Sequence, residues 1–169
     1  MAPVRSYTNW NSRTTDNEAQ KDNQEIAFDK ERDKMIIVFD ADIFEEKVQD
    51  YDKLVASGEK DNILAVTNPA FELFLLLHFE NSYEQDILPN EEAIIKNGKE
   101  GNQTFIYQLL LGKTGINSKK NSKIGDLAAN VDTAISQEKK LNQDIHDCKG
   151  KITCNIGSII ESIRNDDGK

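Results

Sequence analysis

The sequence has little of what would carry a protein into or across a membrane. Its apolar blocks, such as residues 73–77, are far below the roughly 18 residues that a transmembrane helix needs. No charged segment followed by an apolar one opens the chain, so no secretion signal is indicated. Only two cysteines are present, Cys148 and Cys154. We therefore predict a cytoplasmic protein whose two thiols are reduced.

A surplus of positive charge is also missing. The chain has 21 basic and 30 acidic residues, which gives a net charge of -9. This charge argues against binding nucleic acid over the whole surface, so any such binding requires a local basic patch. At 169 residues, with 37% apolar and 30% charged residues, the chain is long enough to bury a core.

The first 33 residues lack a core-forming pattern. They are rich in Asn, Thr, Ser, Gln and charged residues, and their main apolar points are Trp10, Ile26 and Phe28. We predict a polar, partly disordered leader over residues 1–33, followed by one folded domain over residues 34–169.

The domain is organised around a short apolar run that ends in two acids. Residues 35–39 are apolar in succession, which is typical of a strand buried on both faces of a parallel sheet. Helical spacing follows over about 44–56, and a second apolar run covers residues 62–67. This order predicts a parallel strand pair with a right-handed crossover. We expect an α/β fold, with a small parallel sheet flanked by several helices and a helix-rich C-terminal half.

Several helices are expected after the second strand. Asn68 suits the N-cap and Pro69 the first position of a buried helix over 69–79. Residues 80–89 have the composition of a loop. Further helices are predicted over 91–97, 104–111, 124–144 and, capped by Asn155, over 156–163.

Asp40 and Asp42 directly follow the first strand. Alternate residues of extended backbone point the same way, about 6–7 Å apart at Cα, so both carboxylates can reach one Mg²⁺ or one each of two ions. Ligands of open α/β sheets gather at the carboxyl ends of strands. The pair predicts a site for Mg²⁺ or Mn²⁺. The alternative is that both acids favour the N-terminal end of the helix that follows.

Glu72 and His78 lie in the predicted buried helix. If the two strands are adjacent, Glu72 faces the same crevice as the aspartate pair. It is then a third metal ligand or a general base, or else a carboxylate that stabilises the N-terminus of its helix. For His78, the alternative to a catalytic role is a core histidine bonded to the backbone.

Residues 112–123 form a locally basic loop in an acidic chain. The loop holds no acid, and its lysines are Lys113, Lys119, Lys120 and Lys123. It predicts contacts with the phosphates of a nucleic acid, and a solvated loop is the alternative.

Two segments of the chain resemble the RloB-like family. One is Ile-Ile-Val-Phe-Asp-Ala-Asp at 36–42, and the other is Asn-Pro-Ala-Phe-Glu-Leu-Phe-Leu-Leu-Leu-His-Phe at 68–79. The likeness extends from about residue 34 to the end of the chain and includes residues 123–127 and 155–157.

This resemblance implies a Toprim-like fold, a Rossmann-type sheet whose acids bind Mg²⁺ for phosphodiester chemistry. It also implies a role in bacterial restriction loci and in abortive infection against phage, beside an ATPase partner. Asp40 and Asp42 would be the metal-binding aspartates. Glu72 and His78 would belong to the family's second signature, which we assign to catalysis.

The chain departs from the Toprim pattern upstream of its first strand. A Toprim core opens with an apolar strand that leads to a glutamate near a glycine, usually taken as the acid/base. Here Glu18, Glu25 and Glu31 neither follow an apolar strand nor precede a glycine. We therefore expect a truncated family member, or one that has lost its first strand, with one acid missing from its site.

Three functions remain open from the sequence. The first is a Mg²⁺-dependent nuclease, or a truncated nuclease subunit, in bacterial phage defence. The second is a haloacid-dehalogenase-like phosphatase with Asp40 as nucleophile and Asp42 as acid/base, in which Asp126 would supply the last acidic motif although it opens a predicted helix. The third is a non-catalytic interaction module that docks a partner ATPase.

Overall fold

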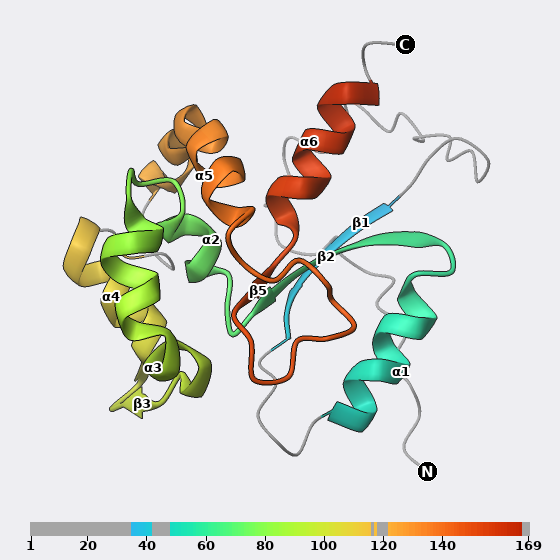
Figure 1. Ribbon diagram of the computed structural model, residues 1–169, viewed down its shortest axis with the longest axis horizontal. Helices are drawn as coiled ribbons and strands as arrows, with labels where there is room; N and C mark the ends of the chain where they lie inside the picture. Colours follow the sequence, from blue (N-terminus) through green and yellow to red (C-terminus); the bar gives the residue numbers. More distant parts are fainter. Residues whose placement is uncertain (1–34, 42–47, 116, 118–121, 167–169) are drawn as a thin grey trace, which may run out of the picture. The chain divides into compact units, whose positions relative to one another are not determined.

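The computed structural model describes residues 35–41, 48–115, 117 and 122–166. Strand β1 (Met35–Asp40) leads to helix α1 (Val48–Gly58) and then to strand β2 (Asn62–Asn68), as Figure 1 shows. The two strands are parallel and adjacent over their whole length. The predicted parallel pair joined through a helix is therefore confirmed, and with it the α/β class.

A third strand makes the sheet mixed rather than wholly parallel. Strand β5 (Thr153–Cys154) lies antiparallel to β2, so the order is β1-β2-β5. Two residues are too few to produce an alternating pattern, which is why β5 has no signal in the sequence. A separate hairpin pairs β3 (Lys99–Glu100) with β4 (Gln103–Thr104).

The helix-rich second half is confirmed, with some boundaries shifted. Helix α3 (Glu91–Lys96) and helix α4 (Phe105–Thr114) lie where helices are predicted, and α6 (Ile156–Asp166) runs further than expected. Residues 80–89 are more regular than a loop, because η1 (Tyr83–Ile87) is a π-helix and η2 (Leu88–Asn90) is a 3₁₀-helix.

The long helix predicted over 124–144 is wrong. Residues Ser122–Asn130 form a 3₁₀-helix, η3, and α5 covers only Val131–Glu138. The chain leaves the helix because Asn142 pairs with the β5 segment instead: its N–H donates to the Ile152 carbonyl and its carbonyl accepts from Cys154 N–H.

The buried helix after β2 begins later than predicted. Asn68 is the last residue of β2 and is joined to Pro69 by a cis peptide bond, and α2 spans only Glu72–Leu76. The side-chain amide of Asn68 donates to the carbonyls of Cys148 (3.1 Å) and Lys151 (2.9 Å). The N-cap prediction is therefore wrong, because strand pairing and these bonds hold Asn68 in the sheet.

Two hydrophobic clusters cover the sheet, one on each face. On one face, Tyr51 and Val55 of α1 pack against Leu64 and Val66 of β2. On the other face, Ala65 belongs to a larger cluster built by α2, α4, α5 and α6. Figure 1 shows α1 and the other helices on opposite sides of the strands. Since successive strand residues point to opposite faces, β2 is buried on both.

Strand β1 is open where β2 is enclosed. Ile37 and Phe39 point to the α1 side and join its cluster. Ile36 and Val38 point to the opposite face and remain 40% and 55% exposed, and Met35 is exposed as well. The prediction that this strand is buried on both faces is wrong. It lies at the edge of the sheet that the described residues form, and the helices there cover β2 only.

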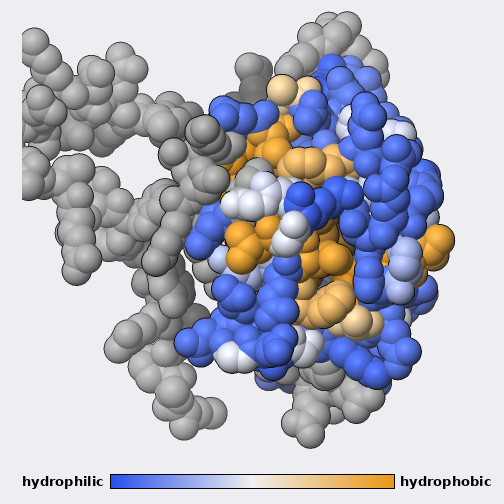
Figure 2. All heavy atoms as spheres, turned by 90° about the vertical axis from the view of Figure 1, so that its left-hand side faces the viewer, coloured by the Kyte–Doolittle hydropathy of each residue, from blue (hydrophilic) through white to orange (hydrophobic). Residues whose placement is uncertain are grey.

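The helical side of the domain carries apolar residues at its surface. Figure 2 faces this side and shows apolar side chains gathered between hydrophilic ones. Helix α4 is apolar on nearly all sides, and its residues Phe105, Leu109 and Leu111 are only half-buried. None of the helices in the described ranges is long and apolar enough to cross a membrane.

Candidate metal-binding edge of the sheet

Asp40 is anchored at the carboxyl end of β1. It lies opposite Thr67 in the parallel register, and the Thr67 hydroxyl donates to Asp40 Oδ1 at 2.9 Å. One residue later, Ala41 N–H donates to the Thr67 carbonyl at 2.7 Å and extends the strand pairing. Thr67 is fully buried, whereas Asp40 is exposed. The oxygen of an oriented, solvent-facing carboxylate is the ligand that Mg²⁺ prefers, so Asp40 fits a cation site.

Glu72 follows the neighbouring strand at the same edge of the sheet. The strand adjacency on which its predicted role depends is confirmed. Glu72 is the first residue of α2 and is partly buried. Within the described part of the chain, no three His, Cys, Asp or Glu side chains are grouped as a metal site, and Asp42 lies outside that part. The described residues therefore supply a portion of the predicted site.

His78 is enclosed in the core rather than facing the edge. Its Nδ1 lies 2.9 Å from the Phe74 carbonyl, and because a carbonyl only accepts, Nδ1 carries the proton. The imidazole also contacts the Phe74 ring edge-on, with centroids 4.9 Å apart. Burial lowers the pKa of His78 below its ordinary value, against the opposing effect of its backbone bonds. This is the arrangement of a core histidine bonded to the backbone, the alternative given above.

The predicted basic loop is only partly described. Lys113 belongs to the last turn of α4 and forms an ion pair with Asp86 of η1, so its charge is neutralised locally. Lys119 and Lys120 lie outside the described residues, as does the side chain of Lys123. The predicted contacts of this loop with nucleic acid stay a prediction.

The side chain of Asn155, the residue directly before α6, supports β2. Its side-chain oxygen accepts from Val66 N–H at 2.7 Å, and its amide donates to the Leu64 carbonyl at 2.8 Å. The side chain thus satisfies the backbone of β2 as a neighbouring strand would. Asn155 holds the position predicted for the cap, directly before α6, and its carbonyl accepts from Ile159 N–H at 3.1 Å, while its side-chain amide bonds β2.

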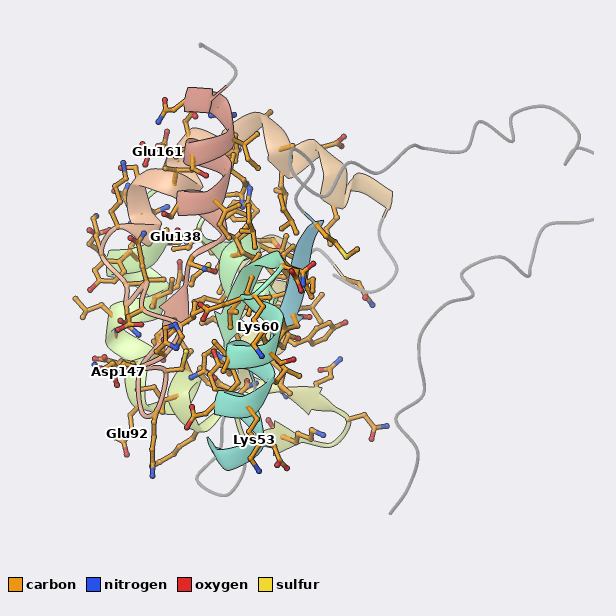
Figure 3. All side chains as sticks on the ribbon, turned by 90° about the vertical axis from the view of Figure 1, so that its right-hand side faces the viewer. Lys53, Lys60, Glu92, Glu138, Asp147 and Glu161 are labelled. Atoms are coloured by element: carbon orange, nitrogen blue, oxygen red, sulfur yellow. The ribbon has the colours of Figure 1, made fainter. Side chains whose placement is uncertain are left out.

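The first turn of α6 is held by Glu138 of α5, which Figure 3 labels beside that helix. Glu138 Oε2 accepts from Gly157 N–H (2.7 Å) and the Cys154 thiol (3.0 Å), and Oε1 accepts from Ser158 N–H (2.9 Å) and the Gln143 amide (3.2 Å). Burial raises the pKa of Glu138, although all four of these bonds favour its charged form. A Cβ at Gly157 would lie 3.1 Å from the carboxylate, so glycine permits the contact.

Sequence reasoning missed Glu138 and Thr67 for different reasons. Glu138 falls three residues after Ile135 and four after Ala134, on the buried stripe of its helix. A lone charged residue within a buried stripe indicates a buried carboxylate with specific partners, so this position could have been found from the sequence. Thr67 gave no such signal, because its bond to Asp40 depends on the register between two strands.

Among the described residues, Asp126 does not fit the last acidic motif of the phosphatase alternative. Asp126 lies exposed in the 3₁₀-helix η3, and no strand precedes it directly among the described residues. An acid that follows no strand is not delivered to the carboxyl edge beside Asp40.

A comparison with known families identifies the relatives of this chain. No curated protein and no solved structure matches the sequence. The sequence model of the family described as RloB-like protein matches residues 5–163, nearly the whole chain. The chain therefore belongs to the RloB-like family.

Proposed function

We propose that this chain is a Mg²⁺-dependent nuclease of Toprim type, or a subunit of one, acting in bacterial defence against phage. The observation that carries the proposal is the position of Asp40, an exposed carboxylate that a buried threonine hydroxyl orients at the carboxyl edge of a parallel strand pair. Membership of the RloB-like family supports the same assignment. A cytoplasmic location and an ATPase partner belong to this proposal.

Each residue of the edge has a role in the proposal. Asp40 and Asp42 hold the cation, and the Thr67 hydroxyl fixes the orientation of the Asp40 carboxylate. Glu72, at the start of α2, is a further ligand or the base that accepts a proton from water. Bound Mg²⁺, or Mn²⁺, would stabilise charge on the phosphate and activate a water molecule. His78 is a positioning residue that holds α2 through Phe74.

The test is a Mg²⁺ titration by calorimetry of the wild type and of the variant that combines Asp40→Asn with Asp42→Asn. We expect the variant to bind Mg²⁺ at least about tenfold more weakly, because asparagine keeps the shape and removes the charge. Asp61→Asn is the matched control, since Asp61 is an exposed acid just before the amino end of β2. Equal affinity in the double variant would contradict the metal site. Cleavage of labelled DNA and RNA with and without EDTA then tests hydrolysis.

A second candidate function is the non-catalytic interaction module. The observation that favours it is the row of exposed apolar side chains on the edge strand, Met35, Ile36 and Val38. Exposed apolar edge strands are surfaces for pairing with another chain. We expect a variant that combines Ile36→Lys and Val38→Lys to lose copurification with the ATPase partner that this function proposes. Retained copurification, or metal-dependent cleavage by the isolated chain, would contradict this function.

A further inference from the structure

Phe71 is an exposed aromatic residue in the segment that follows β2. It lies between β2 and α2 and directly precedes Glu72. Its side chain is 38% exposed, and it is the only aromatic one among the large apolar side chains that the described residues expose. A phenylalanine at the surface leaves apolar area in water that a ligand can cover.

The ring is held in a fixed place by the residues beneath it. Its centroid lies 6.1 Å from that of Phe74, with the two rings inclined by 45°. Phe74 is buried and makes the edge-on contact with His78 described above. The Phe71 carbonyl also accepts a hydrogen bond from Leu75 N–H at 3.3 Å. A ring supported in this way loses little freedom when a flat ligand stacks on it.

Phe71 follows closely in the chain on the residue that bonds Asp40. Thr67, which bonds Asp40, is four residues before Phe71, and Asn68 between them is tied to the carbonyls of Cys148 and Lys151. The segment that carries Phe71 therefore starts from a fixed point at the carboxyl edge. When the phosphate of a nucleotide binds a cation at Asp40, its base extends to the neighbouring segment, which carries Phe71.

We propose that Phe71 stacks on a nucleobase of the substrate and selects an unpaired strand. This inference rests on the proposed nuclease function and names its substrate class. Aromatic side chains bind single strands by stacking on base faces, with little dependence on sequence. Inside a duplex both faces of each base are already stacked on other bases. The Phe71 ring can therefore stack fully only on an unpaired base. The acids nearby make phosphate binding depend on the cation.

The test measures fluorescence anisotropy with three labelled probes and the full chain, in Ca²⁺ to keep the probes intact. The probes are a single-stranded oligodeoxyadenylate, a duplex of the same sequence and an abasic chain of equal length. We expect Phe71→Leu to bind the single strand about tenfold more weakly, with the abasic chain unaffected and Phe71→Trp close to wild type. Leu54→Ala, which changes an exposed apolar side chain of α1, is the control for altered surface.

Two kinds of result overturn the inference. One is unchanged binding of the single strand by Phe71→Leu, with a wild-type circular dichroism spectrum. The other is wild-type protein that binds the duplex or the abasic chain as tightly as the single strand. In either case, Mg²⁺ binding that depends on Asp40 leaves the proposed metal site intact. Conversely, stacking that depends on Phe71 without any Mg²⁺ binding supports the inference and contradicts the proposed function.

Discussion

Strands β1 and β2 are parallel neighbours of similar composition, yet β2 is buried and β1 is largely exposed. The sequences MIIVFD and NILAVTN are both apolar runs that end in polar residues. Residues 64–68 of β2 are buried, whereas Met35, Ile36 and Val38 of β1 are exposed. Because composition is alike, the difference comes from what packs against each strand. An apolar run therefore specifies a strand without specifying its place in the sheet.

Shortening a valine in each strand is the strongest test of this comparison. Val66 is fully buried, so Val66→Ala leaves a cavity and we expect a loss of about 2–3 kcal/mol of unfolding free energy. Val38 is 55% exposed, and we expect Val38→Ala to change stability by no more than about 0.5 kcal/mol. Urea denaturation of both variants measures the difference. Equal losses would mean that β1 is covered in solution.

Removing the side chain of Asn155 tests the support that only β2 receives. Asn155→Ala leaves Val66 N–H and the Leu64 carbonyl without these partners, and we expect a loss of about 2 kcal/mol. The control is Asn90→Ala, because the Asn90 amide donates a hydrogen bond to the carbonyl of the nearby Asp86. We expect this substitution to cost about 1 kcal/mol or less. Thermal denaturation compares the two, and equal losses would remove the special role of Asn155.

The elements that the sequence predicts are those built from local signals. The parallel pair follows from two apolar runs separated by a helical period, and α3 and α4 follow from helical spacing within single segments. Strand β5 and the end of α5 were missed, because both depend on pairing of residues 142 and 153. Contacts between distant segments likewise place Asn68 in β2 and direct the side chain of Asn155 to the β2 backbone, where local rules favour helix caps.

The sequence likewise predicts one part of the candidate site and not another. The position of Asp40 at a strand end follows from the sequence, since the apolar run stops there. Its orientation does not, because it is set by the hydroxyl of Thr67, 27 residues away. The burial of His78 was one of two alternatives, and spacing alone does not distinguish a catalytic histidine from a core histidine. Contacts of the core at that position make the distinction.

The smallest effect is expected from pH, and it extends the comparison to the segment that follows β2. That segment runs into the core and carries His78, a titratable group buried without a charged partner among the contacts described above. Burial holds its pKa below 6.5, so the folded chain keeps the ring neutral where the unfolded chain binds a proton. The stability that the neutral ring of His78 contributes is fully present above pH 6.5. It is lost as the pH falls through the pKa of His78 in the folded chain.

The His78→Gln variant isolates this contribution. Glutamine is neutral throughout, so we expect the unfolding free energy of the variant to decrease less than that of the wild type between about pH 8 and about pH 5. Glu138 acts in the opposite sense, because burial raises its pKa above 4.5 and the folded chain then gains stability as the pH falls. Since both proteins contain Glu138, the difference between their pH profiles removes its effect. Parallel profiles would show that His78 titrates normally and that the core after β2 is open to water.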